Sequence, residues 1–290
     1  MILGEKRYNA KLLLFGEYSI LHGSKAISCP LSAFHAKWDR QQKPEMSILP
    51  FIAHAKANLA DALDTLRMAE DHAKGLYLSS SIPFGYGLGS SGSLVAAFMY
   101  RYLIKKDYSL EQLKSMMATL ESFFHGKSSG TDPLVSFFNH PFVFHDSERI
   151  ELLSRDLAID KLHIYLLDSG KQRATSKLVK AYLDRIAVDP SFATATKEIS
   201  KVNDAIISDI LNASSKNLMQ KINTLSMLQH THMQDMIMDR ILKHWTTSLL
   251  HETYAMKLCG AGGGGFYLVI SEELLAPDKF DGYTLQHVML

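Results

Sequence analysis

Cysteine is scarce in this sequence, and long apolar runs are absent. The two cysteines, Cys29 and Cys259, lie far apart and form no CxxC pair. They are therefore expected to be reduced, buried thiols of a cytoplasmic protein. No stretch approaches the roughly 18 uninterrupted apolar residues of a membrane span, and residues 1–9 lack the apolar segment of a signal peptide. The sequence thus predicts a cytoplasmic protein that has no membrane partner.

An excess of charge of either sign is also missing. The 290 residues carry 31 Lys and Arg against 30 Asp and Glu, so the net charge is 31 − 30 = +1. A nearly neutral chain has no strong electrostatic attraction to nucleic acid or to a membrane surface, so neither is expected as a partner. Hydrophobic residues make up 47% and charged residues 21% of the chain, as in ordinary globular proteins. The length allows one large domain or two modest ones.

Glycine, in contrast, is concentrated in one stretch, residues 81–93, which reads S-I-P-F-G-Y-G-L-G-S-S-G-S. A strand-like run at 76–78 precedes it. Apolar residues at helical spacing follow it, namely Leu94, Val95, Phe98 and Tyr102. Glycines let the backbone fold tightly and bring its N–H groups close to a ligand. The N-terminus of the following helix adds free N–H donors and a partial positive charge, so the stretch predicts a site for phosphate.

Other interpretations of this stretch are less well supported. Gly87-x-Gly89-x-x-Gly92 fits the dinucleotide fingerprint by letter, but that fold needs a strand ending in an acid about 20 residues further on. That distance falls in a polar break between helices, which argues against a nicotinamide dehydrogenase. A Walker A loop is excluded because no Lys follows the last glycine. An ordinary glycine turn before a core helix stays open. However, the hydroxyls of Ser90 and Ser91 suit phosphate or Mg²⁺, and a turn does not require both of them.

A carboxylate lies on the apolar face of the next expected helix. That face is formed by Leu110, Leu113, Met117, Leu120 and Phe124. Glu121 follows Met117 by four residues and projects from the same face. A carboxylate on a core-facing stripe is costly unless a cation or a metal pairs with it. The alternative is a Glu at the edge of the stripe whose side chain reaches solvent.

Three further charged residues are candidates for the site, and two of them, Asp132 and Glu17, stand beside proline or glycine. Asp132 follows a small, polar segment and precedes Pro133, which favours an extended backbone at the Asp. Its alternative role is the N-cap of a short helix that starts at Pro133. Lys11 begins an apolar strand, and Glu17 lies in a glycine-bounded loop. Both are candidate site residues, and the alternative is that both are solvated surface charges.

Strands and helices are expected along the rest of the chain from their apolar patterns. Strands are expected at residues 11–15, 142–144, 161–167, 256–259, 266–270 and 283–290, and helices at 51–66 and across 192–251. Five of the six residues in Gly260–Gly265 are glycine. Such a run allows close backbone approach to a ligand or to another loop. A flexible hairpin tip is the alternative.

The glycine-marked segments Lys11–Gly23, Pro83–Ser93 and Lys257–Gly265 resemble, in this order, the three motifs of the GHMP kinase superfamily. The superfamily is named for galactokinase, homoserine kinase, mevalonate kinase and phosphomevalonate kinase. Within it, the likeness is greatest to the mevalonate kinase family. The segment from Glu121 to Asp132 looks like the one that runs in that family from the metal-binding Glu to the catalytic Asp. The resemblance covers nearly the whole chain and favours a functional role for both acids.

The resemblance implies a role for each matching residue. Asp132 matches the catalytic residue that accepts or orients the proton of the attacking hydroxyl, and Lys11 matches the lysine near it and near the transferred phosphoryl group. Ser91 and Glu121 match the Mg²⁺ ligands. The residues implied to bind the ATP phosphates are Gly85, Gly87, Leu88, Gly89, Ser90, Ser91 and Gly92. The residues implied to bind the substrate are Glu17, Tyr18, Gly262 and Gly263.

The resemblance also implies the fold and the reaction. The implied fold is α+β, with a ribosomal-protein-like N-terminal domain over residues 1–155, a ferredoxin-like C-terminal domain over residues 156–290, and a cleft between them. The implied reaction is the ATP- and Mg²⁺-dependent transfer of the γ-phosphoryl group to the primary hydroxyl of mevalonate, in isoprenoid precursor synthesis. ATP and Mg²⁺ are the implied cofactors, and a small molecule is the implied partner. The oligomeric state stays open, a homodimer included.

Departures from the family pattern keep other substrates open. Tyr18 stands where mevalonate kinases commonly carry His, and Gly92 replaces the usual Ala. Gly-Glu-Tyr is more like phosphomevalonate kinases. With phosphomevalonate as the acceptor, Lys171 and Arg173 of this chain would hold the second phosphate, and the alternative is that both are exposed surface cations. A kinase for another small alcohol or sugar is a further alternative. A non-catalytic nucleotide-binding protein of the same fold is the last, and the presence of all the catalytic and metal-binding residues named above counts against it.

Overall fold

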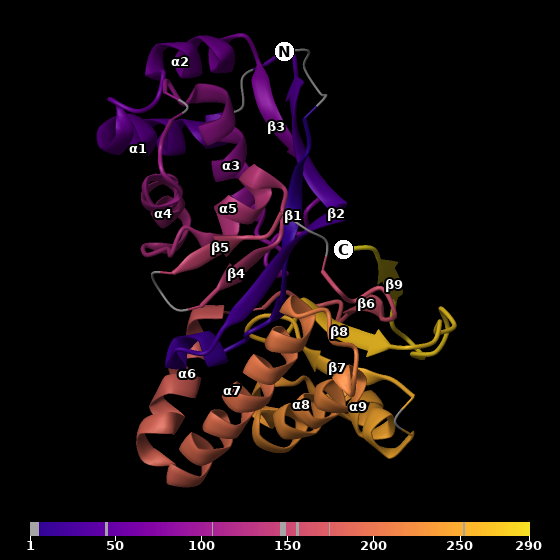
Figure 1. Cartoon of the computed structure of the whole chain (residues 1–290). Helices are drawn as coiled ribbons and strands as arrows, with labels where there is room; N and C mark the ends of the chain where they lie inside the picture. Colours follow the sequence, from indigo (N-terminus) through magenta and orange to yellow (C-terminus); the bar gives the residue numbers. More distant parts are fainter. Residues whose placement is uncertain are drawn as a thin grey trace. The chain divides into compact units, whose positions relative to one another are not determined.

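The computed structural model describes residues 6–43, 46–105, 107–145, 149–154, 157–173, 175–251 and 253–290 (Figure 1). The chain packs into two compact units. Unit 1 takes its residues from Met1–Lys11, Pro30–Pro83 and Leu88–His140, and unit 2 from Leu12–Cys29, Phe84–Gly87 and Pro141–Leu290. Each unit is therefore built from separate stretches of the chain. The expected domain boundary between residues 155 and 156 lies outside the described residues.

The secondary structure alternates strands with pairs or runs of helices. The strands are β1 (Tyr8–Phe15), β2 (Ala26–Arg40), β3 (Leu76–Ser80), β4 (Phe142–Phe144), β5 (Ile150–Leu152), β6 (His163–Asp168), β7 (Ala255–Leu258), β8 (Phe266–Ser271) and β9 (Leu285–Val288). The α-helices are α1 (Leu49–Leu59), α2 (Thr65–Ala73), α3 (Ser90–Tyr102), α4 (Leu110–His125), α5 (Thr131–Phe138), α6 (Thr175–Val188), α7 (Pro190–Leu211), α8 (Leu218–His232) and α9 (Asp239–His251). Short 3₁₀ helices lie at η1 (Ser19–His22), η2 (Met46–Ile48) and η3 (Gln234–Met236).

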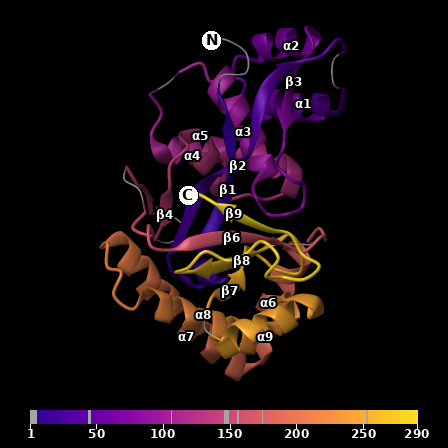
Figure 2. The ribbon, with the colours of Figure 1, turned by 90° about the vertical axis from the view of Figure 1, so that its right-hand side faces the viewer.

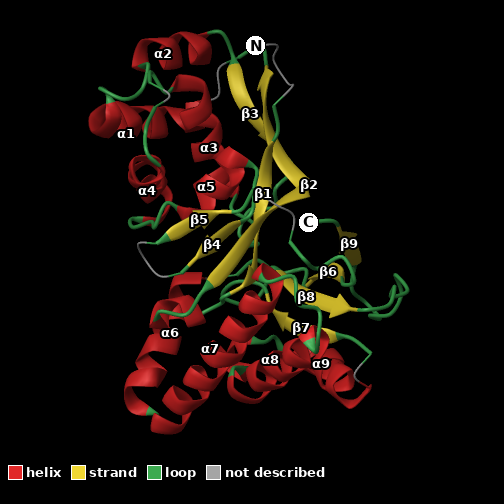
Figure 3. Ribbon diagram, viewed as in Figure 1, coloured by secondary structure: helices red, strands yellow, loops and turns green. Residues whose placement is uncertain are grey.

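In unit 1, helices cover one side of a twisted pair of strands. Strand β3 pairs antiparallel with the second half of β2, with Trp38 opposite Leu78. Figure 3 shows α1 to α5 gathered beside these strands. Aromatic rings fill the space between them: the ring centroid of Phe98 lies 5.1 Å from that of Trp38 and 4.9 Å from that of Phe51. Burial of these large apolar side chains stabilises the packing of the helices on the strands.

In unit 2, a four-stranded antiparallel sheet has the order β7-β8-β6-β9. Figure 2 shows helices α6 to α9 on one side of it. Every residue of β8 is buried, as expected for a central strand that is flanked by other strands and covered by helices. Strand β4 does not belong to this sheet. It belongs to the sheet that contains β2, and it pairs there with the start of β2 and with β5. The connection between β7 and β8 is the glycine run Gly260–Gly265.

One expected helix was wrong. The apolar spacing over residues 51–66 predicted a single helix, but α1 ends at Leu59 and α2 starts at Thr65. Asp64 caps α2 by accepting a hydrogen bond from the backbone N–H of Arg67, and such a cap competes with continuation of the preceding helix. Leu66, counted in the apolar stripe, is 80% exposed.

The remaining expectations concern a strand, a long helical region, the two cysteines and the lack of a membrane span. The strand at Phe142–Phe144 is confirmed, and the helical region 192–251 consists of α7, α8 and α9. Cys29 and Cys259 are both reduced and buried, as expected. Within the described residues, no helix combines the length and the apolar character needed to cross a membrane.

Candidate active site

The glycine-rich stretch leads into α3 through left-handed backbone. Gly89 is the N-cap of α3 and has φ 72°, a conformation that costs glycine little. A Cβ at Gly89 would lie 2.8 Å from the Cγ of Lys11, and one at Gly92 would lie 3.0 Å from the backbone carbon of Asp132. The N–H of Lys11 donates to the carbonyl of Leu88 at 3.0 Å. The absence of side chains therefore lets the first turn of α3 lie directly against Lys11 and Asp132.

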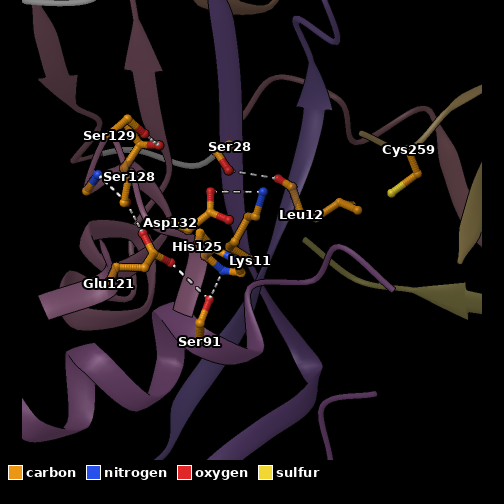
Figure 4. A network of polar contacts seen from close by, with 12 residues as sticks. Lys11, Leu12, Ser28, Ser91, Glu121, His125, Ser128, Ser129, Asp132 and Cys259 are labelled. Atoms are coloured by element: carbon orange, nitrogen blue, oxygen red, sulfur yellow. Dashed lines mark hydrogen bonds and ion pairs between the residues drawn. The ribbon is translucent and has the colours of Figure 1, made fainter. Parts of the chain in front are cut away.

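Lys11 and Asp132 form an ion pair in unit 1. The Nζ of Lys11 lies 2.9 Å from Oδ1 of Asp132, and the two side chains are 9% and 34% exposed (Figure 4). Lys11 comes from β1 and Asp132 from the first turn of α5, whose N-cap is Gly130. The alternatives of a solvated Lys11 and of an Asp132 that caps the helix are both wrong. The pair combines a buried cation with a carboxylate that a ligand can reach.

Glu121 is buried within a cluster of hydroxyl groups. Its side chain projects from α4, and the residue is 4% exposed, so the alternative of a solvent-facing Glu is wrong. Oε1 accepts a hydrogen bond from the Oγ of Ser91 at 3.1 Å, and Oε2 accepts one from the hydroxyl of Ser128. The Nε2 of His125 lies 3.0 Å from the same Ser91 hydroxyl (Figure 4). His125 belongs to the segment that resembles the family, in which it has no assigned role, and its place one helical turn after Glu121 puts both on one face of α4.

The surroundings of Glu121 favour its neutral form. Burial, together with the nearby charge of Asp132, raises its pKa to about 7. The hydroxyls of Ser128 and Ser91 and the charge of Lys11 oppose this shift. No ion pair to Glu121 occurs among the described residues. A buried carboxylate in this condition is stabilised by an added cation.

The raised pKa of Glu121 predicts a pH-dependent effect of Glu121→Gln on stability. As the pH rises from about 4.5 to about 7, the unfolded chain loses this proton before the folded one, so the wild type loses stability over this window. Glutamine does not titrate. The variant should therefore gain stability relative to wild type between pH 5 and pH 8, by up to about 3 kcal/mol. Urea unfolding of both proteins at the two pH values measures this difference. A difference in the free energy of unfolding between the two proteins that is the same at pH 5 and at pH 8 would contradict the prediction.

In unit 2, the carboxylate of Glu17 is engaged by a lysine. The Nζ of Lys257 donates to Oε1 of Glu17 at 2.5 Å and to the carbonyl of Leu258 at 2.7 Å. Both side chains of the pair are 1% exposed, so the alternative of a solvated Glu17 is wrong. Burial raises the pKa of Glu17, and the charge of Lys257 opposes that shift. The pair joins the end of β1 to β7 inside unit 2.

Tyr18 and the glycine run are joined in unit 2. Tyr18 has φ 59°, which is strained for a bulky residue. Its hydroxyl donates to the carbonyl of Ala261 at 2.7 Å. The N–H of Gly263 donates to the carbonyl of Met236 at 2.7 Å, and a Cβ at Gly262 would lie 2.3 Å from that same oxygen. These contacts hold the run in place, so it is not a flexible hairpin tip.

Arg173 lies against both glycine loops of unit 2. Its backbone N–H donates to the carbonyl of Gly85 at 3.1 Å, and its guanidinium donates to the carbonyl of Cys259 at 2.6 Å. A Cβ at Gly87 would lie 1.8 Å from the guanidinium, and one at Gly260 would lie 2.3 Å from it. From the sequence, Arg173 was expected only as an additional cation for a second phosphate. Its contacts with both loops depend on residues distant in sequence and could not be predicted from local patterns.

Comparison with known proteins gives the family of this arrangement. Residues 52–140, which include the glycine-rich stretch, Glu121 and Asp132, match the GHMP kinases N terminal domain. The chain carries a GHMP kinase N-terminal domain. Mevalonate kinase of Pyrococcus furiosus is 25% identical to this chain, and the match covers 93% of this chain and 88% of that one.

Solved structures show that the GHMP kinase fold extends over the whole chain. L. major mevalonate kinase in complex with R-mevalonate has a TM-score of 0.65 at 16% identity, and covers 99% of this chain and 96% of its own. Streptococcus pneumoniae phosphomevalonate kinase, in complex with phosphomevalonate and AMPPNP, has a TM-score of 0.60 at 16% identity, with 94% and 93% covered. The expected fold class, α+β of the GHMP kinase type, and the expected enzyme class, a kinase, are thereby confirmed.

Proposed function

We propose that this GHMP kinase transfers the γ-phosphoryl group of Mg²⁺-ATP to the primary hydroxyl of mevalonate. The observation that carries the proposal is the Lys11–Asp132 pair at 2.9 Å, set against the glycine-rich start of α3. Phosphoryl transfer needs alignment and charge neutralisation more than covalent chemistry. A lysine, a reachable carboxylate and a helix N-terminus supply these requirements within unit 1.

The residues around Glu121 fit a Mg²⁺ ion. A buried carboxylate and the hydroxyl of Ser91 are hard oxygen donors of the kind that Mg²⁺ prefers, and Mg²⁺ in kinases takes its other ligands from phosphates and water. This agrees with the absence, among the described residues, of any group of three or more His, Cys, Asp or Glu that could hold a metal. When bound, the ion would neutralise phosphate charge. In this proposal Ser91 and Glu121 hold it.

An aromatic cavity in unit 1 supports the use of ATP. It has a volume of about 210 Å³ and lies between β3 and helices α1 to α4. The lining side chains include Trp38, Ile52, Phe98, Tyr102 and Phe124. Leu94, which also lines it, follows Ser90 by one turn of α3. An apolar cavity one helical turn from a phosphate-binding helix start suits the adenine ring. This cavity was not expected from the sequence.

The chain's own residues account for the proton that leaves the substrate. Asp132 takes the proton of the attacking hydroxyl as the bond from the hydroxyl oxygen to the γ-phosphorus forms and the bond from that phosphorus to the bridging oxygen of ADP breaks, so that ADP leaves. Lys11 orients the carboxylate through its 2.9 Å contact and brings positive charge to this point. The N–H groups at the start of α3 would hold the ATP phosphates. The backbone of Leu88, which accepts from Lys11, fixes the loop to this pair.

Mevalonate is favoured as the acceptor by the curated relatives, of which the one described above is a mevalonate kinase. Phosphomevalonate is the second candidate. It is favoured by Tyr18 in place of His and by the guanidinium of Arg173 in unit 2, which has more N–H donors than its hydrogen bond to the carbonyl of Cys259 uses.

A coupled ADP-release assay tests the proposal. Purified enzyme with Mg²⁺-ATP is given mevalonate, phosphomevalonate, galactose or homoserine, and the Asp132→Asn protein is run in parallel to detect contaminating kinases. Turnover with mevalonate alone is expected. Turnover with phosphomevalonate alone would transfer the assignment to the second candidate. ATP binding without turnover on any of the four would refute the mevalonate assignment.

A further inference from the structure

We propose that His125 is a positioning residue that accepts a hydrogen bond from the hydroxyl of Ser91. With the hydroxyl proton directed at His125, the oxygen of Ser91 and the carboxylate of Glu121 can both face a divalent cation. The inference rests on the proposed function, because it concerns the same cation. It gives a role to a residue that lies within the segment from Glu121 to Asp132 and to which the resemblance assigns none.

The geometry places one hydroxyl between two acceptors. The Oγ of Ser91 lies 3.1 Å from Oε1 of Glu121 and 3.0 Å from Nε2 of His125. Glu121 and His125 are four residues apart on α4 and therefore lie on one face of it, opposite the first turn of α3 (Figure 4). A serine hydroxyl has a single proton to donate and two lone pairs to accept with.

Counting protons shows why the second acceptor matters. Oε2 of Glu121 already accepts from Ser128, whose own hydroxyl is fixed by the N–H of Gly130 at 3.0 Å. Oε1 is therefore the carboxylate oxygen that is left for a cation. If Ser91 donates its proton to Oε1, that proton lies between the two atoms that have to bind the ion. Donation to Nε2 of His125 instead leaves lone pairs of Ser91 and of Oε1 directed at the same point.

The position of His125 suits this role and allows it to be tested. It is the last residue of α4, and Gly126 ends the helix with φ 72°. The side chain of His125 is exposed, so its replacement leaves no cavity in the core. Neutral imidazole with its proton on Nδ1 offers Nε2 as an acceptor. A glutamine at this position can also accept through its side-chain oxygen, whereas a phenylalanine fills the space without an acceptor.

The experiment measures cation binding directly and compares His125→Phe with His125→Gln. Mn²⁺ is titrated into each protein at saturating ADP, and free Mn²⁺ is followed by electron paramagnetic resonance. We expect His125→Phe to weaken Mn²⁺ binding about tenfold, the effect of losing one hydrogen bond to a charged site. His125→Gln should stay within about threefold of wild type. In turnover, the Phe variant should need more Mg²⁺ for half-maximal rate, while kcat at saturating Mg²⁺ changes little.

Control variants separate the possible failures. Glu121→Gln should lose Mn²⁺ binding, and His140→Phe, a change at an exposed histidine outside the cluster, should not. Wild-type Mn²⁺ affinity in His125→Phe would overturn the role of His125 and leave the kinase assignment standing. Equal losses in the Phe and Gln variants would also overturn it, because a structural role does not distinguish the two. A wild-type protein that neither binds Mn²⁺ with ADP nor turns over would overturn the inference together with the proposed function.

Discussion

Asp132→Asn is expected to lower turnover by about 10² to 10⁴-fold while ATP affinity stays within about threefold of wild type. The substitution keeps the size of the side chain and one acceptor oxygen, but an amide cannot take a proton from the attacking hydroxyl. The carboxylate is 34% exposed and touches Lys11, whereas the cavity proposed for adenine is lined by other residues. The variant should therefore bind nucleotide and fail in the chemical step. Steady-state kinetics together with calorimetric ATP binding measure both quantities.

A second aspartate provides the matched control for this experiment. Asp61 lies in an exposed turn of unit 1, so Asp61→Asn changes the same chemical group outside the candidate site. Its turnover should match that of wild type. Near wild-type turnover in Asp132→Asn would remove Asp132 from the mechanism. A large loss of ATP affinity with little change in kcat would instead show that Asp132 acts in nucleotide binding.

Local patterns in the sequence predicted the parts of the site that lie close together along the chain. The glycine-rich stretch, the helix that starts at Ser90 and the core-facing position of Glu121 each depend on neighbours within a few turns. The resemblance supplied the roles of Lys11 and Asp132, and their 2.9 Å contact is a result of the structure. That resemblance includes His125 in a matching His-Gly pair but gives it no role. The proton of Ser91 becomes a problem only when both hydrogen-bond acceptors are seen around one hydroxyl.

Contacts between distant parts of the chain could not be predicted in this way. Tyr18 and Ala261 are 243 residues apart, and their hydrogen bond is visible only in the folded unit. The strain at Tyr18 is likewise a property of the fold, since a sequence pattern carries no φ angle. The 15-residue strand β2 was not predicted, because it contains Pro30 and mixes buried and exposed residues without strict alternation. Asp64, which separates α1 from α2, was outweighed by an apolar spacing that continued beyond it.

Removal of the lysine that pairs with Glu17 is expected to have the largest effect on stability. Lys257→Met should destabilise the protein by about 3–5 kcal/mol, because it leaves a buried carboxylate without its cation. Both side chains are 1% exposed, so water cannot replace the lost partner. The loss should be smaller at pH 5 than at pH 8. Burial already raises the pKa of Glu17, and without the lysine the folded state gains most from protonating it. Urea unfolding at both pH values measures the effect.

Two comparisons test whether Lys257→Met lowers stability through the lost charge of the lysine or through its lost volume. Glu17→Gln combined with Lys257→Met leaves no buried charge, so the double variant should be more stable than Lys257→Met alone. Lys180→Met breaks an ion pair of 2.6 Å to Asp184 whose side chains are 75% and 63% exposed, and it should cost less than about 1 kcal/mol. If the double variant were as unstable as the sum of its single changes, the lysine side chain would be acting through its packing and not through its charge. The glycine run Gly260–Gly265 begins three residues after Lys257 in the chain, so the same variants test whether this pair also holds the run in position. In that case the substrate KM should rise in Lys257→Met and recover in the double variant.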